Sequence, residues 1–169
     1  MNEKKKEPNN SSSPVAAAAK FVRLTTEQQR KDFYASLKGP QWWTNGGKKD
    51  SERGWIQVFE LSHWKCIYCG HDLAASTDAL AESTEEHLVP RSLLEPNGAE
   101  PNVAHNMAAC CAGCNALKGE YVPSQDHSCW KSRQAYVKES FRFISSQRLK
   151  NYLKYRNHVE KVLRERAGE

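Results

Sequence analysis

Hydrophobic and polar positions in the first third of the chain predict two short helices joined by turn-forming residues. A helix is predicted up to about Leu37, with Thr25 or Thr26 as its cap and a glutamine at position 28 or 29 completing a capping box. Gly39, followed by proline, should end this helix. Residues 55–64 have apolar side chains at spacings that favour a short buried helix, with a strand as the alternative.

The middle of the chain predicts a hairpin followed by a helix. Residues 84–89 are expected to form a strand, which Pro90 ends because proline has no amide hydrogen for ladder bonding. Residues 93–104 contain proline and Asn-Gly turn signals and predict a loop. The chain should return from about Asn106, and a helix should open at residues 114–118.

The two ends of the chain have contrasting patterns. Residues 1–19 are polar and rich in Ser, Pro and Ala, and should be disordered. Beyond Pro123 the pattern predicts two helices, at about 130–144 and 146–166. The second has one apolar face, made by Leu149, Tyr152, Leu153, Val159, Val162 and Leu163.

We expect the chain to form one α+β domain, and its length and composition allow only a modest core. It has 169 residues, of which 38% are hydrophobic, and its mean hydropathy is −0.80. No apolar run approaches the length of about 20 residues that a membrane span needs. The apolar run at 15–19 is too short for the core of a signal peptide. We therefore expect a cytoplasmic protein without a membrane partner, whose tryptophans lie mainly in the core.

Charge is unevenly distributed along the chain. Residues 66–120 contain only two Lys/Arg against eight Asp/Glu, whereas both flanks have an excess of Lys and Arg. A polyanionic partner would have to be attracted by the flanks while the central module holds cations. This arrangement fits a metal-dependent nuclease better than a simple basic binding finger.

Four of the six cysteines form two closely spaced pairs, Cys66-x-x-Cys69 and Cys111-x-x-Cys114. Two such knuckles can close a tetrahedral Zn²⁺ site, which would be structural because all four positions are filled by protein. In a reducing compartment, metal explains these cysteines better than disulfides do. The other two cysteines are expected to be small, mostly buried thiols.

Residues 66–119 hold a longer ordered set of motifs: Cys66-x-x-Cys69, Glu86-His87, Pro90-Arg91, Asn106 and Cys111-x-x-Cys114-Asn115-x-x-Lys118. This set resembles the zinc-knuckle form of the HNH endonuclease family. Asn115 stands where the third signature residue is often histidine, as in the HNN variant. The resemblance implies a ββα-metal core, made of a zinc-stapled hairpin and a helix, here wrapped by flanking helices.

The resemblance also implies roles for individual residues. His87 would be the general base, and Glu86 and Asn115 would bind one catalytic Mg²⁺ or Mn²⁺, while Asn106 would hold the histidine loop in place. The chemistry agrees, because an imidazole titrates near neutral pH and these divalent ions prefer oxygen ligands. Adjacent strand residues point to opposite faces, so Glu86 and His87 need a local distortion or different approaches to one site. Glu85 is an alternative metal ligand, since the family more often has Asp at position 86.

The expected reaction is hydrolysis of DNA phosphodiester bonds, with RNA as an alternative substrate, leaving 5′-phosphate and 3′-hydroxyl ends as in the family. Arg91 and Lys118, the only basic residues of the module, are either phosphate contacts or solvated charges. The rival hypothesis is a non-catalytic zinc module that binds nucleic acid or protein and does not need His87. The expected organisation is a tail at 1–19, a helical flank at 20–65, the nuclease core at 66–120 and basic C-terminal helices at 121–169.

Overall fold

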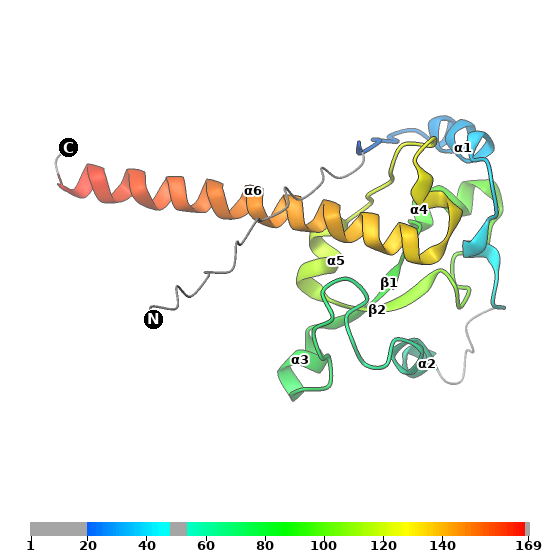
Figure 1. The fold of residues 1–169 in the computed structure, drawn as a ribbon, viewed down its shortest axis with the longest axis horizontal. Coiled ribbons are helices and arrows are strands. Elements are labelled where there is room, and N and C mark those ends of the chain that lie inside the picture. Colours follow the sequence, from blue (N-terminus) through cyan, green and yellow to red (C-terminus); the bar gives the residue numbers. More distant parts are fainter. Residues whose placement is uncertain (1–19, 48–53, 168–169) are drawn as a thin grey trace, which may run out of the picture.

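The structure is a computed structural model that describes residues 20–47 and 54–167 (Figure 1). The tail at 1–19, expected to be disordered, lies outside the described residues. Residues 48–53 of the expected helical flank and the last two residues of the chain also lie outside them.

The N-terminal flank contains the predicted helices. Helix α1 spans Glu27–Ser36 and is capped by Thr26, whose hydroxyl accepts from the Gln29 amide while the Gln29 side chain accepts from the Thr26 amide. This reciprocal pair is the predicted capping box. A short 3-10 helix, η1 (Trp42–Thr44), follows, and α2 spans Gly54–Leu61. The helical alternative for residues 55–64 is therefore confirmed.

The centre of the molecule is a two-stranded antiparallel hairpin. Strand β1 (Ser83–His87) pairs with β2 (Met107–Cys111), with His87 opposite Met107 and Ser83 opposite Cys111. Helix α5 (Ala112–Lys118) begins directly after β2, because Cys111 is both the last strand residue and the helix N-cap. The predicted order of hairpin and then helix is confirmed, and the fold is mixed α+β.

The segments around β1 contain more helix than predicted. Helix α3 (Thr77–Ala81) precedes the strand. Helix α4 (Arg91–Leu94) and the 3-10 helix η2 (Glu95–Asn97) occupy the start of the connection where we expected a loop at 93–104. The leucines at 93 and 94 are buried in the core, so packing stabilises a helical turn that the proline and glycine signals concealed.

The C-terminal region differs from the prediction in one respect. After a 3-10 helix, η3 (Ser128–Lys131), a single helix, α6, spans Arg133–Ala167. Our separation into two helices at 144–146 is wrong, because the serines there are accommodated within one helix. The Ser146 hydroxyl donates to the Phe143 carbonyl at 2.7 Å, so it satisfies its hydrogen bonding without interrupting the helix.

The two halves of α6 have different surroundings. The first half packs on the domain and buries Tyr136 and Ile144, whereas the second half projects away from it (Figure 1). The predicted apolar face of the second half is therefore largely exposed rather than packed. The exposed large side chains of this half are Leu149, Tyr152, Leu153, Tyr155 and Leu163.

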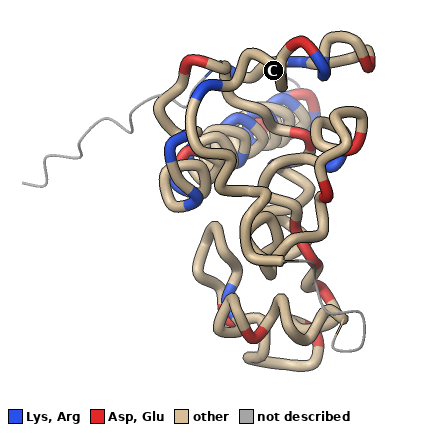
Figure 2. The backbone as a smooth tube through the Cα atoms, turned by 90° about the vertical axis from the view of Figure 1, so that its right-hand side faces the viewer, with Lys and Arg blue, Asp and Glu red and all other residues tan. Residues whose placement is uncertain are grey.

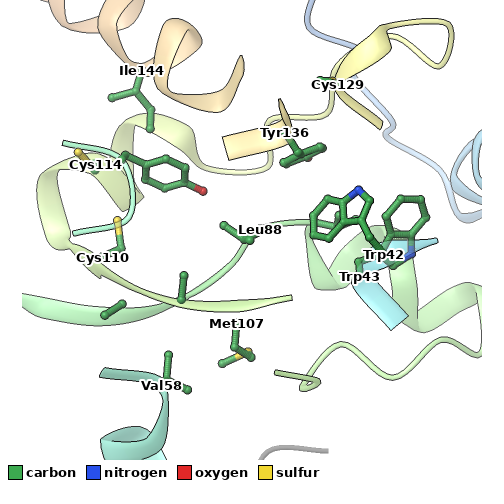
Figure 3. Packing of buried hydrophobic residues seen from close by; sticks show 14 of the residues in the cluster. Trp42, Trp43, Val58, Leu88, Met107, Cys110, Cys114, Cys129, Tyr136 and Ile144 are labelled. Carbon is green, nitrogen blue, oxygen red and sulfur yellow. The ribbon is translucent and has the colours of Figure 1, made fainter. Parts of the chain in front are cut away.

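Buried apolar residues pack on both faces of the hairpin and form one hydrophobic core (Figure 3). Helix α2 contributes Val58 beside Met107 on one face, and α5 and α6 lie over the other face. At one end of the core, Trp42 and Trp43 lie with ring centroids 5.4 Å apart. Cys129 is also buried, and burial raises the pKa of its thiol to about 12, so it behaves as an apolar core residue.

The charge pattern in space follows the pattern along the chain. Lys and Arg gather in the upper half of Figure 2, at the height of α1, α4 and α6 in Figure 1, and the lower half carries mostly Asp and Glu. Within the described part of the chain, no helix combines the length and apolar character that crossing a membrane would require.

Candidate functional site

The four paired cysteines converge at one point between the start of β1 and the start of α5. The sulfur atoms of Cys66, Cys69, Cys111 and Cys114 all lie within 4.8 Å of one another, and those of Cys69 and Cys111 are 3.9 Å apart. A tetrahedral zinc site with Zn–S bonds of about 2.3 Å requires sulfur separations of about 3.8 Å. The donor set and its spacing therefore fit a metal ion such as zinc, as the sequence predicted.

The backbone holds each knuckle against the hairpin. Gly70 has a φ of 71° and its amide donates to the Cys66 carbonyl at 2.9 Å, which closes the first knuckle with a residue that tolerates left-handed backbone. The Ile67 amide donates to the Ala109 carbonyl of β2 at 3.0 Å, so this knuckle is docked on the second strand. The second knuckle needs no separate loop, because Cys111 ends β2 and Cys114 lies in the first turn of α5.

A fifth sulfur lies behind the cluster. The Cys110 sulfur is 3.8 Å from that of Cys66, and the hydrogen bond between them lowers the pKa of Cys66 to about 3 while the pKa of Cys110 is raised. Cys66 is thus favoured as the thiolate and Cys110 as the thiol donor. Burial raises the pKa of Cys114, which would lose its proton on binding metal.

An arginine of the long helix reaches the cluster from outside. Arg148 of α6 donates from Nη2 to the Cys114 sulfur at 2.9 Å. Burial lowers the pKa of this guanidinium, but the charge of Cys114 and a hydrogen bond with Cys69 outweigh burial and raise it. The sequence analysis missed Arg148, because it is one of many basic residues in the C-terminal third and lies far from the cysteines along the chain.

His87, the predicted general base, ends β1 and is half-buried. Its Nε2 atom lies 2.9 Å from the Oδ1 atom of Asn102, a residue that the sequence analysis also missed. Because Oδ1 can only accept, this contact assigns the ring hydrogen to Nε2 and leaves Nδ1 with its lone pair. Burial lowers the pKa of His87, and the bond to Asn102 offsets part of that decrease.

Asn106 is fully buried and lies behind the histidine. Its Oδ1 accepts from the Val89 amide at 2.9 Å, and its Nδ2 donates to the carbonyls of Val89 and Pro101 at 3.2 and 3.0 Å. These bonds join the segment that follows His87 to the segment that carries Asn102. Asn106 therefore contacts the loop backbone and does not line the pocket around His87.

Glu86 and Lys118 form a buried ion pair, with exposed side-chain fractions of 4% and 1% and an Nζ–Oε1 distance of 2.5 Å. The Tyr68 hydroxyl donates to the same oxygen at 3.0 Å; burial raises the pKa of Tyr68 well above its usual range, so it remains protonated. The Lys118 ammonium also donates to the His87 carbonyl at 3.1 Å. Both predicted site residues are thus already engaged with protein partners.

A shallow pocket of about 220 Å³, named here the His87 pocket, brings most of the predicted hydrolytic residues together. It is lined by Glu85, Glu86, His87, Pro90, Arg91, Ser92, Asn115, Lys118, Gly119 and Glu120. The pairing of β1 with β2 runs without a bulge, and Glu86 and His87 both line this pocket from neighbouring strand positions. Arg91 lies at the rim, where its guanidinium donates twice to Glu95 at 2.9 and 2.6 Å.

Comparison of the chain with known protein families, with curated proteins and with solved structures found no match.

Proposed function

We propose that this protein is a metal-dependent endonuclease of the HNH type, in which a ββα-metal core stapled by structural zinc hydrolyses DNA phosphodiester bonds. The observation that supports this most strongly is the His87 pocket. There an imidazole with a fixed hydrogen-bond partner lies among the oxygen donors Glu86 and Asn115, on a hairpin and helix joined by the cysteine cluster.

In this proposal His87 accepts a proton from the attacking water. Because Asn102 accepts a hydrogen bond from Nε2–H, Nδ1 is the atom that takes the proton from water. The lowered pKa keeps the ring neutral at pH 7, as a base requires. Asn106 acts through the backbone, because it holds both sides of the loop on which His87 and its partner depend.

The oxygen-rich lining of the pocket fits a hard divalent cation such as Mg²⁺ or Mn²⁺. Asn115 and Glu86 would hold the ion, with Glu85 as the alternative to Glu86. When bound, it would supply positive charge for the phosphate and the leaving oxygen. Because the Oε1 atom of Glu86 is engaged by Lys118 and Tyr68, binding through Glu86 uses Oε2 or displaces Lys118.

The two basic residues of the module differ in how readily they can contact phosphate. The pair between Arg91 and Glu95 is exposed and therefore weak, so Arg91 can exchange this partner for a phosphate oxygen. Lys118 can do so only if its buried pair with Glu86 opens. We propose phosphate contact for Arg91 and a supporting role for Lys118.

Nicking of supercoiled plasmid in the presence of Mg²⁺ or Mn²⁺ tests the proposal. We expect His87→Ala to lower the rate by roughly 10²–10⁴-fold, the usual contribution of a general base. His105→Ala is the matched control, because this exposed histidine lies outside the His87 pocket. Zinc content and circular dichroism should be unchanged in both variants.

The rival function, a non-catalytic zinc module, is favoured by one observation. Glu86 is held in the interior by Lys118 and Tyr68, as expected of a structural contact. If the wild type and His87→Ala are equally inactive while folded and loaded with zinc, the rival function holds and the endonuclease proposal fails.

A further inference from the structure

A second cavity, of about 400 Å³, continues from the His87 pocket along the N-terminal flank. We name it the flank groove; it is lined by Phe21, Val22, Arg23, Leu24, Thr25, Arg30, Ser92, Leu93, Glu120 and Val122. Ser92 and Glu120 line both cavities. The groove and the His87 pocket are therefore neighbouring cavities.

The flank is fixed in this place by pairing with the segment that follows α5. The Val22 amide donates to the Val122 carbonyl at 2.9 Å, and Phe21 forms an isolated antiparallel bridge with Pro123. The Phe21 ring also stacks on Tyr121, with centroids 6.0 Å apart. Arg23 thus follows a segment anchored beside the end of α5.

The charges around the two cavities show why the groove matters for binding. Of the module's own two cations, Lys118 is held in a buried pair with Glu86, whereas Arg91 pairs with Glu95 at the surface and can exchange that partner. The His87 pocket is lined by three carboxylates against two cations, Arg91 and Lys118, so its net charge is negative, and a bound divalent cation would offset that charge.

The flank groove has the opposite character. It is lined by two arginines, Arg23 and Arg30, and by one acidic residue, Glu120, which also lines the His87 pocket. Within residues 20–47 and 54–167, neither arginine takes part in a salt bridge. Guanidinium groups match the geometry of phosphate oxygens. The charge of Arg30 contributes to the lowered pKa of Glu27, after the larger effect of Lys31, but among the described residues no salt bridge would have to break for either arginine to bind a phosphate.

We propose that the flank groove binds the phosphodiester backbone of the nucleic acid beside the cleaved bond, with Arg23 and Arg30 each contacting one phosphate. The identity of the ligand rests on the proposed endonuclease function. In this arrangement the acidic module holds the catalytic cation, and the N-terminal flank supplies the attraction that positions the strand.

Binding is measured with the full chain carrying His87→Ala, so that cleavage does not interfere. The probe is a fluorescent DNA duplex of about 20 base pairs, titrated by anisotropy over a range of salt concentrations without added divalent metal. The same titration with a single-stranded DNA and with an RNA duplex of the same sequence identifies which kind of backbone the groove binds. Arg23→Gln combined with Arg30→Gln removes both guanidinium groups.

Each phosphate contact contributes about 0.9 to the slope of log affinity against log salt on duplex DNA, so we expect the double variant to lower this slope by about 1.8. Between about 50 and 200 mM salt, the double variant would then lose roughly tenfold less affinity than the parent chain with His87→Ala alone. Lys31→Gln with Lys38→Gln is the control of equal charge change, because both lysines are exposed and lie outside the groove. Arg23→Lys with Arg30→Lys should restore most of the slope.

The inference is overturned if the glutamine double variant lowers the slope no more than the lysine control does, or if no probe binds even at the lowest salt. Plasmid nicking by the chain with His87 intact separates the two proposals. A reduced slope without nicking leaves the groove as a backbone-binding site and rejects hydrolysis. Nicking that depends on His87, together with an unchanged slope, supports hydrolysis and rejects the groove.

Discussion

His87 depends on a single neighbouring side chain for its orientation and for part of its proton affinity. Asn102 accepts from Nε2, and this bond raises the pKa of His87 against the larger effect of burial, which lowers it below 6.5, the usual value of histidine. Because the base must be neutral, we expect the acid limb of the nicking rate to lie below pH 6.5.

Substitutions of Asn102 should move that acid limb in opposite directions. Asn102→Asp places a negative charge beside Nε2 and should shift the limb to higher pH, whereas Asn102→Ala should shift it to lower pH and also reduce the rate. The measurement is a pH–rate profile at saturating divalent metal. A limb that moves with neither substitution would show that His87 is not the titrating group.

Lys118 was predicted from its position in the motif to be a phosphate contact or a solvated charge. Its buried environment gives it a strong effect on stability instead. Its ammonium lies in the interior with Glu86, so Lys118→Met leaves a buried carboxylate without a counter-ion. We expect this variant to lower the free energy of unfolding by about 3–5 kcal/mol, as measured by urea denaturation. Adding Glu86→Gln should recover part of the loss; a cost below about 1 kcal/mol would mean that the pair is solvated in solution.

At the scale of elements, α6 and the cysteine cluster are joined by one charged contact. A Zn²⁺ ion with four thiolates has a net negative charge, and Arg148 at 2.9 Å from the Cys114 sulfur offsets part of it. We expect Arg148→Gln to weaken zinc affinity roughly 10–100-fold, the usual effect of losing a residue that supports metal ligands.

Competition with a chromophoric chelator measures that change in zinc affinity. Arg156→Gln is the matched control, because Arg156 lies on the same helix but pairs with Glu160, away from the cluster. Equal zinc affinity in the two variants would mean that Arg148 is a surface charge without influence on the metal.

At the scale of the whole molecule, the C-terminal half of α6 can be removed with little loss of the buried core. Deletion from about residue 130, suggested by the charge distribution alone, would remove core residues such as Trp130 and Tyr136. A chain ending at Leu149 instead loses mainly exposed residues, including Lys150, Lys154, Arg156, Lys161, Arg164 and Arg166.

We expect this truncated chain to keep its thermal transition and zinc content but to bind duplex DNA with a smaller salt dependence, because fewer cations remain to release counter-ions. Anisotropy titrations over the same salt range measure this. A salt dependence equal to that of the full chain would exclude the projecting helix from the DNA contact.

The short-range features were predictable because local chemistry determines them. The capping box of Thr26 and Gln29 involves residues three apart, and each cysteine pair closes within one tight turn. The continuity of α6 was not predictable, since serines are weak helix formers and only the structure shows the Ser146 hydroxyl satisfied within the helix. Likewise, the sequence motif does not predict whether a basic residue is exposed, as Arg91 is, or buried, as Lys118 is.

By itself, the amino-acid sequence determined the hairpin-and-helix order, the two knuckles and the grouping of Asn115 with His87, because these depend on residue type and spacing. Only the tertiary structure decided that Asn102 holds the imidazole, that Arg148 contacts the cluster and that Arg23 lines the flank groove. The physical reason is that charge, burial and hydrogen bonding act through space. Each of these contacts joins segments whose proximity follows from packing around one shared core.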